Sequence, residues 1–151
     1  MISPELLRRY ALFAGLPQEL FEAIAQFSDE VILETDTYLF EQNTPAVEAF
    51  LVVSGSVDLL IDMDETGEHR EEVETLVTGE FIGWSALIQP HIYKLSAVTT
   101  EETKIIIIEA DQLRALLAAY PAWGYRVMAR LAKIIGTRLM HMRTRLMSFN
   151  P

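Results

Sequence analysis

Hydrophobic and polar positions along the chain change their spacing twice. Residues 1–30 carry apolar side chains at helical spacing after a start signal, Ser3-Pro4-Glu5, in which the serine hydroxyl can cap the first turn. Residues 31–110 form short β-rich runs separated by turn signals, a spacing typical of an antiparallel sandwich or barrel. Residues 111–150 return to the helical period, which Pro121 interrupts. The pattern predicts a single domain over 1–151, made of a helical lead-in, a β-barrel and C-terminal helices.

The composition is that of a well-packed globular domain. Half of the 151 residues are hydrophobic and none is cysteine, which excludes disulfides, thiolate metal sites and cysteine nucleophiles. The N-terminus carries an acid at Glu5 and lacks the apolar stretch of a signal peptide. The longest aliphatic run, Ile105–Ile108, is far too short to span a bilayer. We therefore expect a cytoplasmic protein with no membrane partner.

Charge is divided unevenly along the chain. Residues 1–111 contain all 22 acids and five bases, a formal charge of −17, whereas residues 112–151 contain seven bases and no acid. A basic segment of this kind can indicate nucleic-acid binding. Its basic residues are spread around the predicted helix, however, and no recognition module follows before Pro151. We therefore expect the helix to lie against an acidic surface, its own or a partner's, and no DNA binding by this chain alone.

The last predicted helix, from about 122 to about 148, carries a continuous apolar stripe. Its positions alternate in steps of three and four, which is the seam of a two-stranded coiled coil: Tyr125, Met128, Ala132, Ile135, Leu139, Met142, Leu146 and Phe149. Other apolar residues widen this face only in the first half of the helix. An unpaired stripe would be a costly exposed patch, so the sequence favours a homodimer over a stripe that folds back on its own barrel. The predicted dimer interface is Met128, Ala132, Ile135, Leu139, Met142 and Leu146.

Patterns for catalysis and metal binding are not found. The histidines, His69, His91 and His141, do not have metal-ligand spacing, and the serine-rich turn at 54–56 has no histidine placed nearby as a base. The sequence therefore argues against an enzyme and predicts neither a metal site nor a cofactor.

Four segments, in this order, resemble the cyclic-nucleotide-binding domain family, the effector half of catabolite-activator-type regulators. They are "LFAGLPQELFEAIA" (12–25), "DTYLFEQNTPAVEAFLVVSGSV" (36–57), "GEFIGWSAL" (79–87) and "KIIIIEADQLRALLAAYP" (104–121). The resemblance covers roughly residues 10–148. It implies a double-stranded β-helix, or jelly roll, with N-terminal helices and a long C-terminal dimerisation helix. It also implies a non-enzymatic regulatory module that senses a small anionic or nucleotide-like ligand.

Glycine positions of the family pattern are kept or replaced conservatively. Asp36 and Asn43 stand where the family usually has glycine, and these two residue types tolerate positive φ best. Gly55, Gly79 and Gly83 are retained. These positions therefore predict that the tight turns of the fold are preserved.

The phosphate-binding cassette departs from the family pattern in its charges. The resemblance implies a glutamate, which accepts from the ribose hydroxyl, where this chain has Trp84, and a phosphate-clamping arginine where it has Leu95. The adjacent Lys94 could act as a point charge, and if 94–98 is a strand only one of the two side chains faces the pocket. The family's base-reading hydroxyl would fall near Arg138 and Leu139. The candidate pocket residues are Gly83, Trp84, Ser85, Ala86, Lys94, Leu95, Ser96 and Ala97.

Three outcomes are open for this pocket. They are a flatter or less anionic ligand stacked on Trp84, a cyclic nucleotide bound through Lys94, and a pocket filled by Trp84, Leu95 and Tyr93. The first predicts a regulatory module that does not use the usual cyclic-AMP mode. The last predicts a structural or partner-binding dimer.

Overall fold

The computed structural model describes residues 1–148, and its N-terminal segment is helical as predicted. The segment contains two 3₁₀ helices, η1 (Pro4–Arg9) and η2 (Ala11–Phe13), followed by α1 (Gln18–Gln26). Ser3 precedes η1, but its side chain makes no capping hydrogen bond, so that expectation was wrong. The apolar residues Leu7, Leu12 and Phe13 are nevertheless fully buried against the rest of the chain.

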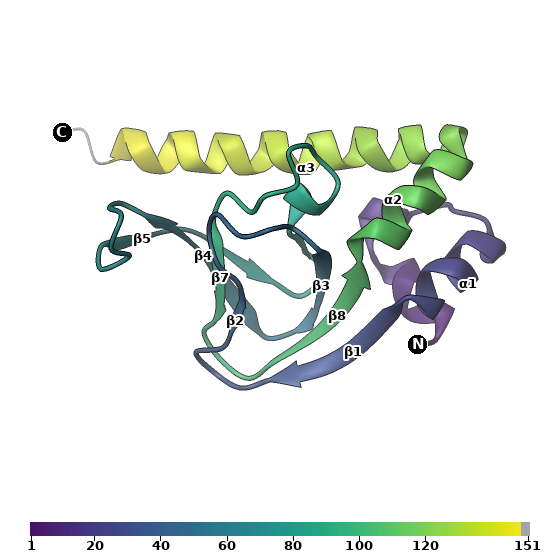
Figure 1. Ribbon diagram of the computed structural model, residues 1–151, viewed down its shortest axis with the longest axis horizontal. Helices are drawn as coiled ribbons and strands as arrows, with labels where there is room; N and C mark the ends of the chain where they lie inside the picture. The colour runs from purple at the N-terminus through teal and green to yellow at the C-terminus, as the bar shows by residue number, and fades with distance from the viewer. Residues whose placement is uncertain (149–151) are drawn as a thin grey trace.

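Eight antiparallel strands form two four-stranded sheets, the jelly roll that the resemblance implied (Figure 1). One sheet has the order β1-β8-β3-β6 and the other β2-β7-β4-β5. The strands are β1 (Ser28–Leu33), β2 (Tyr38–Phe40), β3 (Glu48–Ser54), β4 (Ser56–Asp62), β5 (Arg70–Val77), β6 (Phe81–Ile82), β7 (Ser96–Thr99) and β8 (Thr103–Glu109). The first strand begins at Ser28, three residues before the predicted start of the barrel.

Strand β8 lies at the centre of the core. It pairs with β1 on one side and with β3 on the other. Ile105, Ile106 and Ile108 are completely buried, although neighbouring side chains in a strand point to opposite faces. Both faces of β8 are therefore covered, which explains why its sequence is a continuous aliphatic run rather than an alternating one.

The turns confirm the reading of the replaced glycines. Asp36 and Asn43 have φ angles of 63° and 68°, and Gly55 and Gly83 have φ angles of 104° and 88°. Gly55 also lies so close to β8 that a Cβ atom there would be 2.5 Å from Thr103 Oγ1. The loops of the family pattern are thus kept by residues that tolerate left-handed backbone.

Two helices follow the barrel, α2 (Ala110–Ala119) and α3 (Pro121–Ser148). Pro121 begins α3, and Gly124 lets its first turn pack on α2, since a Cβ atom at Gly124 would be 2.5 Å from the Leu117 carbonyl oxygen. From this joint α3 runs along the barrel to the side of β5 (Figure 1). No helix of residues 1–148 is long and apolar enough to cross a membrane.

The two faces of α3 have different surroundings. Gly124, Val127, Leu131 and Arg138 are buried against the domain. The second half is held to β5 by polar contacts, with His141 Nδ1 2.6 Å from Glu74 Oε1 and Arg145 Nη2 3.4 Å from Glu72 Oε1. The basic helix therefore does lie against acids of its own barrel. Of the predicted seam, Phe149 lies outside the described residues.

Candidate functional site

The cassette segment is positioned by a left-handed glycine. Strand β6 ends at Ile82, Gly83 turns the chain, and a short 3₁₀ helix, η3 (Trp84–Ala86), follows. A Cβ atom at Gly83 would lie 3.3 Å from the Glu48 carbonyl oxygen and 3.5 Å from the rings of Phe50 and Tyr93. The close contact between η3 and β3 therefore depends on this glycine.

Aromatic side chains occupy the space beside the cassette. The rings of Phe40 and Tyr93 stack with centroids 3.8 Å apart and an angle of 10° between their planes. The Tyr93 hydroxyl donates to the Glu48 carbonyl oxygen at 2.5 Å and accepts from the Glu48 N–H at 3.2 Å. Burial raises the pKa of Tyr93 to about 12. This residue is therefore a fixed part of the interior, only 3% exposed.

The cavity left at the cassette has a volume of only about 20 Å³. That is room for about one water molecule, whereas sites for small molecules usually measure about 300–1,000 Å³. Five of the predicted pocket residues line it: Gly83, Trp84, Ser85, Lys94 and Leu95. The other three, Ala86, Ser96 and Ala97, are buried but do not border it.

Lys94 and Leu95 do not lie in a strand, because β7 begins only at Ser96. Both border the small cavity, with Lys94 exposed and Leu95 half-buried. The alternation argument, which allowed only one of them to face the pocket, therefore does not apply. Ser96 instead fixes the neighbouring loop, since its hydroxyl accepts from the backbone N–H of Gln42 at 2.9 Å.

A buried cation on α3 was missed as a site residue. Arg138 is 8% exposed, borders the cassette cavity and donates from Nη2 to the carbonyl oxygen of Phe81 in β6. Its Nη1 has no hydrogen-bond partner within residues 1–148. Burial lowers the pKa of the guanidinium, and the nearby carboxylates of Glu74 and Glu80 oppose this effect. The spacing of Val127, Leu131 and Arg138 on one helix face was the signal that could have revealed it.

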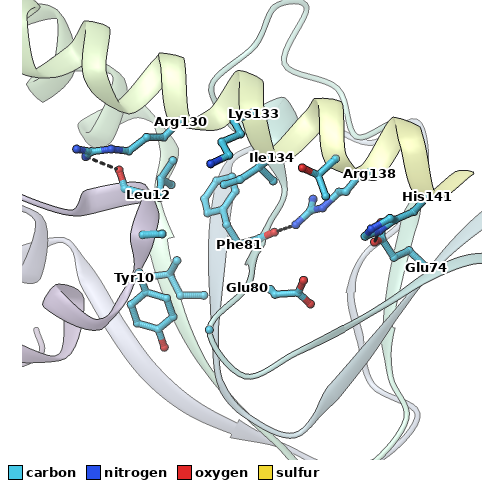
Figure 2. Close-up of a pocket in the computed structure, with 14 residues that line it drawn as sticks. Tyr10, Leu12, Glu74, Glu80, Phe81, Arg130, Lys133, Ile134, Arg138 and His141 are labelled. Atoms are coloured by element: carbon cyan, nitrogen blue, oxygen red, sulfur yellow. Dashed lines mark hydrogen bonds and ion pairs between the residues drawn. The ribbon is translucent and has the colours of Figure 1, made fainter.

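A larger cavity lies under α3, next to the cassette (Figure 2). It measures about 420 Å³ and is lined by η2, the segment joining β5 to β6, and the helix above. Its floor combines apolar residues with the carboxylates of Glu74 and Glu80, and its roof carries the basic residues of α3. Arg138 borders both this cavity and the small one. The sequence pattern gave no sign of this space, because it depends on how the helix packs over the barrel.

The histidines take part in local contacts. His69 Nδ1 lies 3.1 Å from Asp64 Oδ2 in the exposed hairpin, and His91 Nδ1 lies 3.1 Å from the Ser85 carbonyl oxygen. Over residues 1–148 no group of three or more His, Asp or Glu side chains is arranged to hold a metal ion.

The cassette, the jelly roll and the long helix occur together in one known family. The model of the cyclic nucleotide-binding domain matches residues 30–120. The chain belongs to the cyclic nucleotide-binding domain family. Domains of this family are regulatory modules that sense a ligand, which agrees with the type of domain that the sequence resemblance implied.

Relatives of this cyclic nucleotide-binding domain occur in several kinds of protein. The cGMP-dependent protein kinase isozyme 1 of Drosophila melanogaster is 30% identical over 86 residues, which are 57% of this chain but only 11% of the kinase. A solved structure from Geobacter metallireducens GS-15, named as a cyclic nucleotide-binding protein, has a TM-score of 0.81 and 32% identity, covering 92% of this chain and 99% of its own. The Thermus thermophilus catabolite activator protein has a TM-score of 0.68 and 26% identity, covering 97% of this chain and 64% of its own.

Proposed function

We propose that this chain is a dimeric regulatory domain that does not bind a cyclic nucleotide in the usual mode of its family. The observation that supports the proposal best is the size of the cassette cavity, about 20 Å³. The stacked rings of Phe40 and Tyr93 border this cavity, and moving Tyr93 aside to admit a nucleotide would break both hydrogen bonds of its hydroxyl. Opening would leave buried polar groups without partners, which is costly.

The charges around the cassette support the same proposal. A buried phosphate needs a cation or several donors close to it. Lys94 is exposed, and a lysine there is a flexible point charge rather than a bidentate clamp. Arg138 is the buried cation at this site, but its Nη2 is already bonded to Phe81. A phosphate bound through both Nη atoms would therefore compete with that carbonyl, although Nη1 itself has no partner within residues 1–148.

We propose that the second copy of the dimer packs on the apolar stripe of α3. Tyr125, Leu139 and Leu146 on this stripe are 76%, 65% and 70% exposed. The stripe lies next to the buried face of the helix, and two of its residues, Met128 and Ile135, pack partly against the core of the domain. Its exposed edge can therefore meet a twin helix while the adjoining face packs on the barrel, and pairing would remove an exposed apolar surface from water.

Calorimetry with cyclic AMP and cyclic GMP tests the ligand part of this proposal. We expect no saturable binding of either nucleotide at micromolar concentration. Binding that is lost in Lys94→Ala would overturn it and restore the cassette as a nucleotide site built on lysine. Sedimentation equilibrium on the same sample tests the dimer, and a monomer at all concentrations would contradict that part.

The filled cassette also supports a second candidate, a structural or partner-binding dimer that senses no small molecule. In that case the aromatic residues beside the cassette are simply core. The two candidates differ in whether any other cavity of the domain binds a ligand.

A further inference from the structure

The guanidinium of Arg138 is a buried charge that makes no direct ion pair within residues 1–148, although the carboxylates of Glu74 and Glu80 lie near enough to act on its pKa. It forms one hydrogen bond, to the Phe81 carbonyl, and no ion pair with a carboxylate of residues 1–148. Arginine stays protonated in proteins, so burial here places a full positive charge in the interior. Buried charges are normally paired, because an unpaired one costs much of its hydration. The free Nη1 therefore leaves a hydrogen-bond position for an anion from outside residues 1–148.

The cavity under α3 has the room to hold that anion. Its volume of about 420 Å³ falls in the range of small-molecule sites, whereas the cassette cavity on the other side of Arg138 does not. Figure 2 shows Arg130, Lys133 and Arg138 on the helix above the cavity, and Leu12 and Phe81 facing them from below. A molecule lying here would have an apolar surface on one side and cations on the other.

Two carboxylates limit the charge that such a ligand can carry. Glu74 and Glu80 also line the cavity. Glu74 is paired with His141, and Glu80 Oε2 accepts from the Val77 N–H at 2.8 Å. A polyanion would bring several charges near these acids, and like charges repel. A ligand with a single negative charge can instead place it against Arg138 and lay its apolar part on Leu12, Leu51 and Phe81.

We propose that the cavity under α3 is the effector site of this domain and that it takes a compact monoanion with an apolar body, such as an aromatic or aliphatic carboxylate. Arg138 binds the carboxylate, and the floor of the cavity binds the apolar part. The inference rests on the proposed regulatory function and locates its ligand. Because Arg138 joins α3 to β6, an anion that competes with the Phe81 carbonyl for the guanidinium acts directly on the seating of the helix.

The test is a titration of the ¹⁵N-labelled chain with 4-phenylbutyrate, followed by amide chemical shifts. The matched neutral probe is 4-phenylbutan-1-ol, which has the same ring and chain but no charge. We expect saturable shifts at millimolar carboxylate, largest at Gly79, Ile134 and Thr137, which line the cavity, and at least about tenfold weaker binding of the alcohol. Gly83 and Ser85 report separately on the cassette.

Two variants and a control sharpen the result. Arg138→Met removes the proposed anion contact and should weaken the carboxylate about tenfold or more while leaving the alcohol unchanged. Arg143→Met removes an exposed cation of the same helix that does not line the cavity, and should change neither probe. Thr137→Trp places a large side chain at the exposed rim and should block both probes. The fold of each variant is checked by its amide spectrum.

The proposal is overturned if 4-phenylbutyrate gives no saturable shifts, if its shifts centre on Gly83 and Ser85, or if Arg138→Met binds it as well as the parent chain does. These outcomes are distinct from failure of the proposed function, which would show as cyclic-nucleotide binding at the cassette. If neither probe nor nucleotide binds, the domain is the structural dimer of the second candidate.

Discussion

Arg138 on the long helix and Phe81 in β6 are 57 positions apart in sequence and are joined by a hydrogen bond from the guanidinium to the backbone carbonyl. Phe81 lies within the cassette segment 79–87, two residues before the left-handed Gly83. The bond therefore links the proposed dimer helix to the segment that carries the family's ligand site. It also holds a cation at the boundary of the two cavities.

Replacing Arg138 by methionine should leave the free energy of unfolding unchanged or raise it by about 1 kcal/mol. The substitution relieves the burial of an unpaired charge and keeps most of the side-chain volume, and this offsets the lost hydrogen bond to Phe81. Urea denaturation at fixed protein concentration measures the change. A binding-site residue often lowers the stability of its domain, so an unchanged or raised free energy of unfolding fits a binding role for Arg138. A decrease of more than about 2 kcal/mol would instead show that Arg138 is structural.

The fold could be predicted from the sequence because its signals are local. The change from helical to alternating spacing placed the barrel within three residues of its start at Ser28. Asp36 and Asn43 could be assigned positive φ because the family that the chain resembles usually has glycine at both positions and few other residue types tolerate such backbone. Pro121 marked the joint between the two C-terminal helices because proline breaks a helix in its interior but is tolerated in its first turn.

The site was harder to predict, because it depends on contacts between distant segments. Whether the cassette is open depends on the stacking of Phe40 on Tyr93, 53 positions away, which no local pattern encodes. The reading of Lys94 and Leu95 assumed a strand that begins only at Ser96. Arg138 was considered for its place near the family's base-reading position, although its helix position also puts it on one face with the buried residues Val127 and Leu131.

Tyr93→Phe should lower the free energy of unfolding by about 1–2 kcal/mol near neutral pH. The ring and its stacking on Phe40 remain, but the buried Glu48 carbonyl and N–H lose their partner. Thermal or urea denaturation measures the difference. Tyr38→Phe is the matched control, since Tyr38 is 43% exposed and its hydroxyl accepts a hydrogen bond from the partly buried Arg70 instead of joining two backbone groups. An equal effect of both substitutions would contradict the assigned role of Tyr93.

The same tyrosine predicts a loss of stability in alkali. Its pKa is raised from 10.0 to about 12 in the folded chain, so between these values the unfolded chain loses a proton that the folded chain keeps. Stability from this group is complete below pH 10.0 and is lost as the pH rises towards about 12. The loss should be smaller in Tyr93→Phe. A remaining decrease is expected from Tyr10, whose pKa burial also raises.

The two glycines of α3 should respond to alanine in opposite ways. A Cβ atom at Gly124 would lie 2.5 Å from the Leu117 carbonyl oxygen, whereas a Cβ atom at Gly136 meets nothing within 4 Å. Gly136→Ala should stabilise the domain by up to about 1 kcal/mol through helix propensity alone. Gly124→Ala should destabilise it by about 1–3 kcal/mol, because α3 must shift away from α2. Melting temperatures of the pair check the prediction, and a stabilising Gly124→Ala would mean that the packing of α2 on α3 is looser than the structure describes.

Substitutions at two adjacent positions of α3 test which side of the helix forms the dimer seam. Leu139 belongs to the predicted seam and is 65% exposed, while Met140 is 53% exposed and lies outside it. Leu139→Asp should shift the chain towards monomer, because a buried carboxylate at the seam would face its own copy across the two-fold axis. Met140→Asp introduces the same charge next to it and should leave the dimer intact. Sedimentation equilibrium at several concentrations measures both dissociation constants.

The comparison is decisive because the two substitutions match in charge, in helix and in distance from the barrel. Both side chains are largely exposed in the single chain, so neither variant should lose folding stability through the barrel. If both variants dissociate equally, a general charge effect and not a seam explains the association. If only Met140→Asp dissociates, the contact surface lies on the other side of α3, and the alternating spacing of Met128, Ala132 and Ile135 is not a dimer seam.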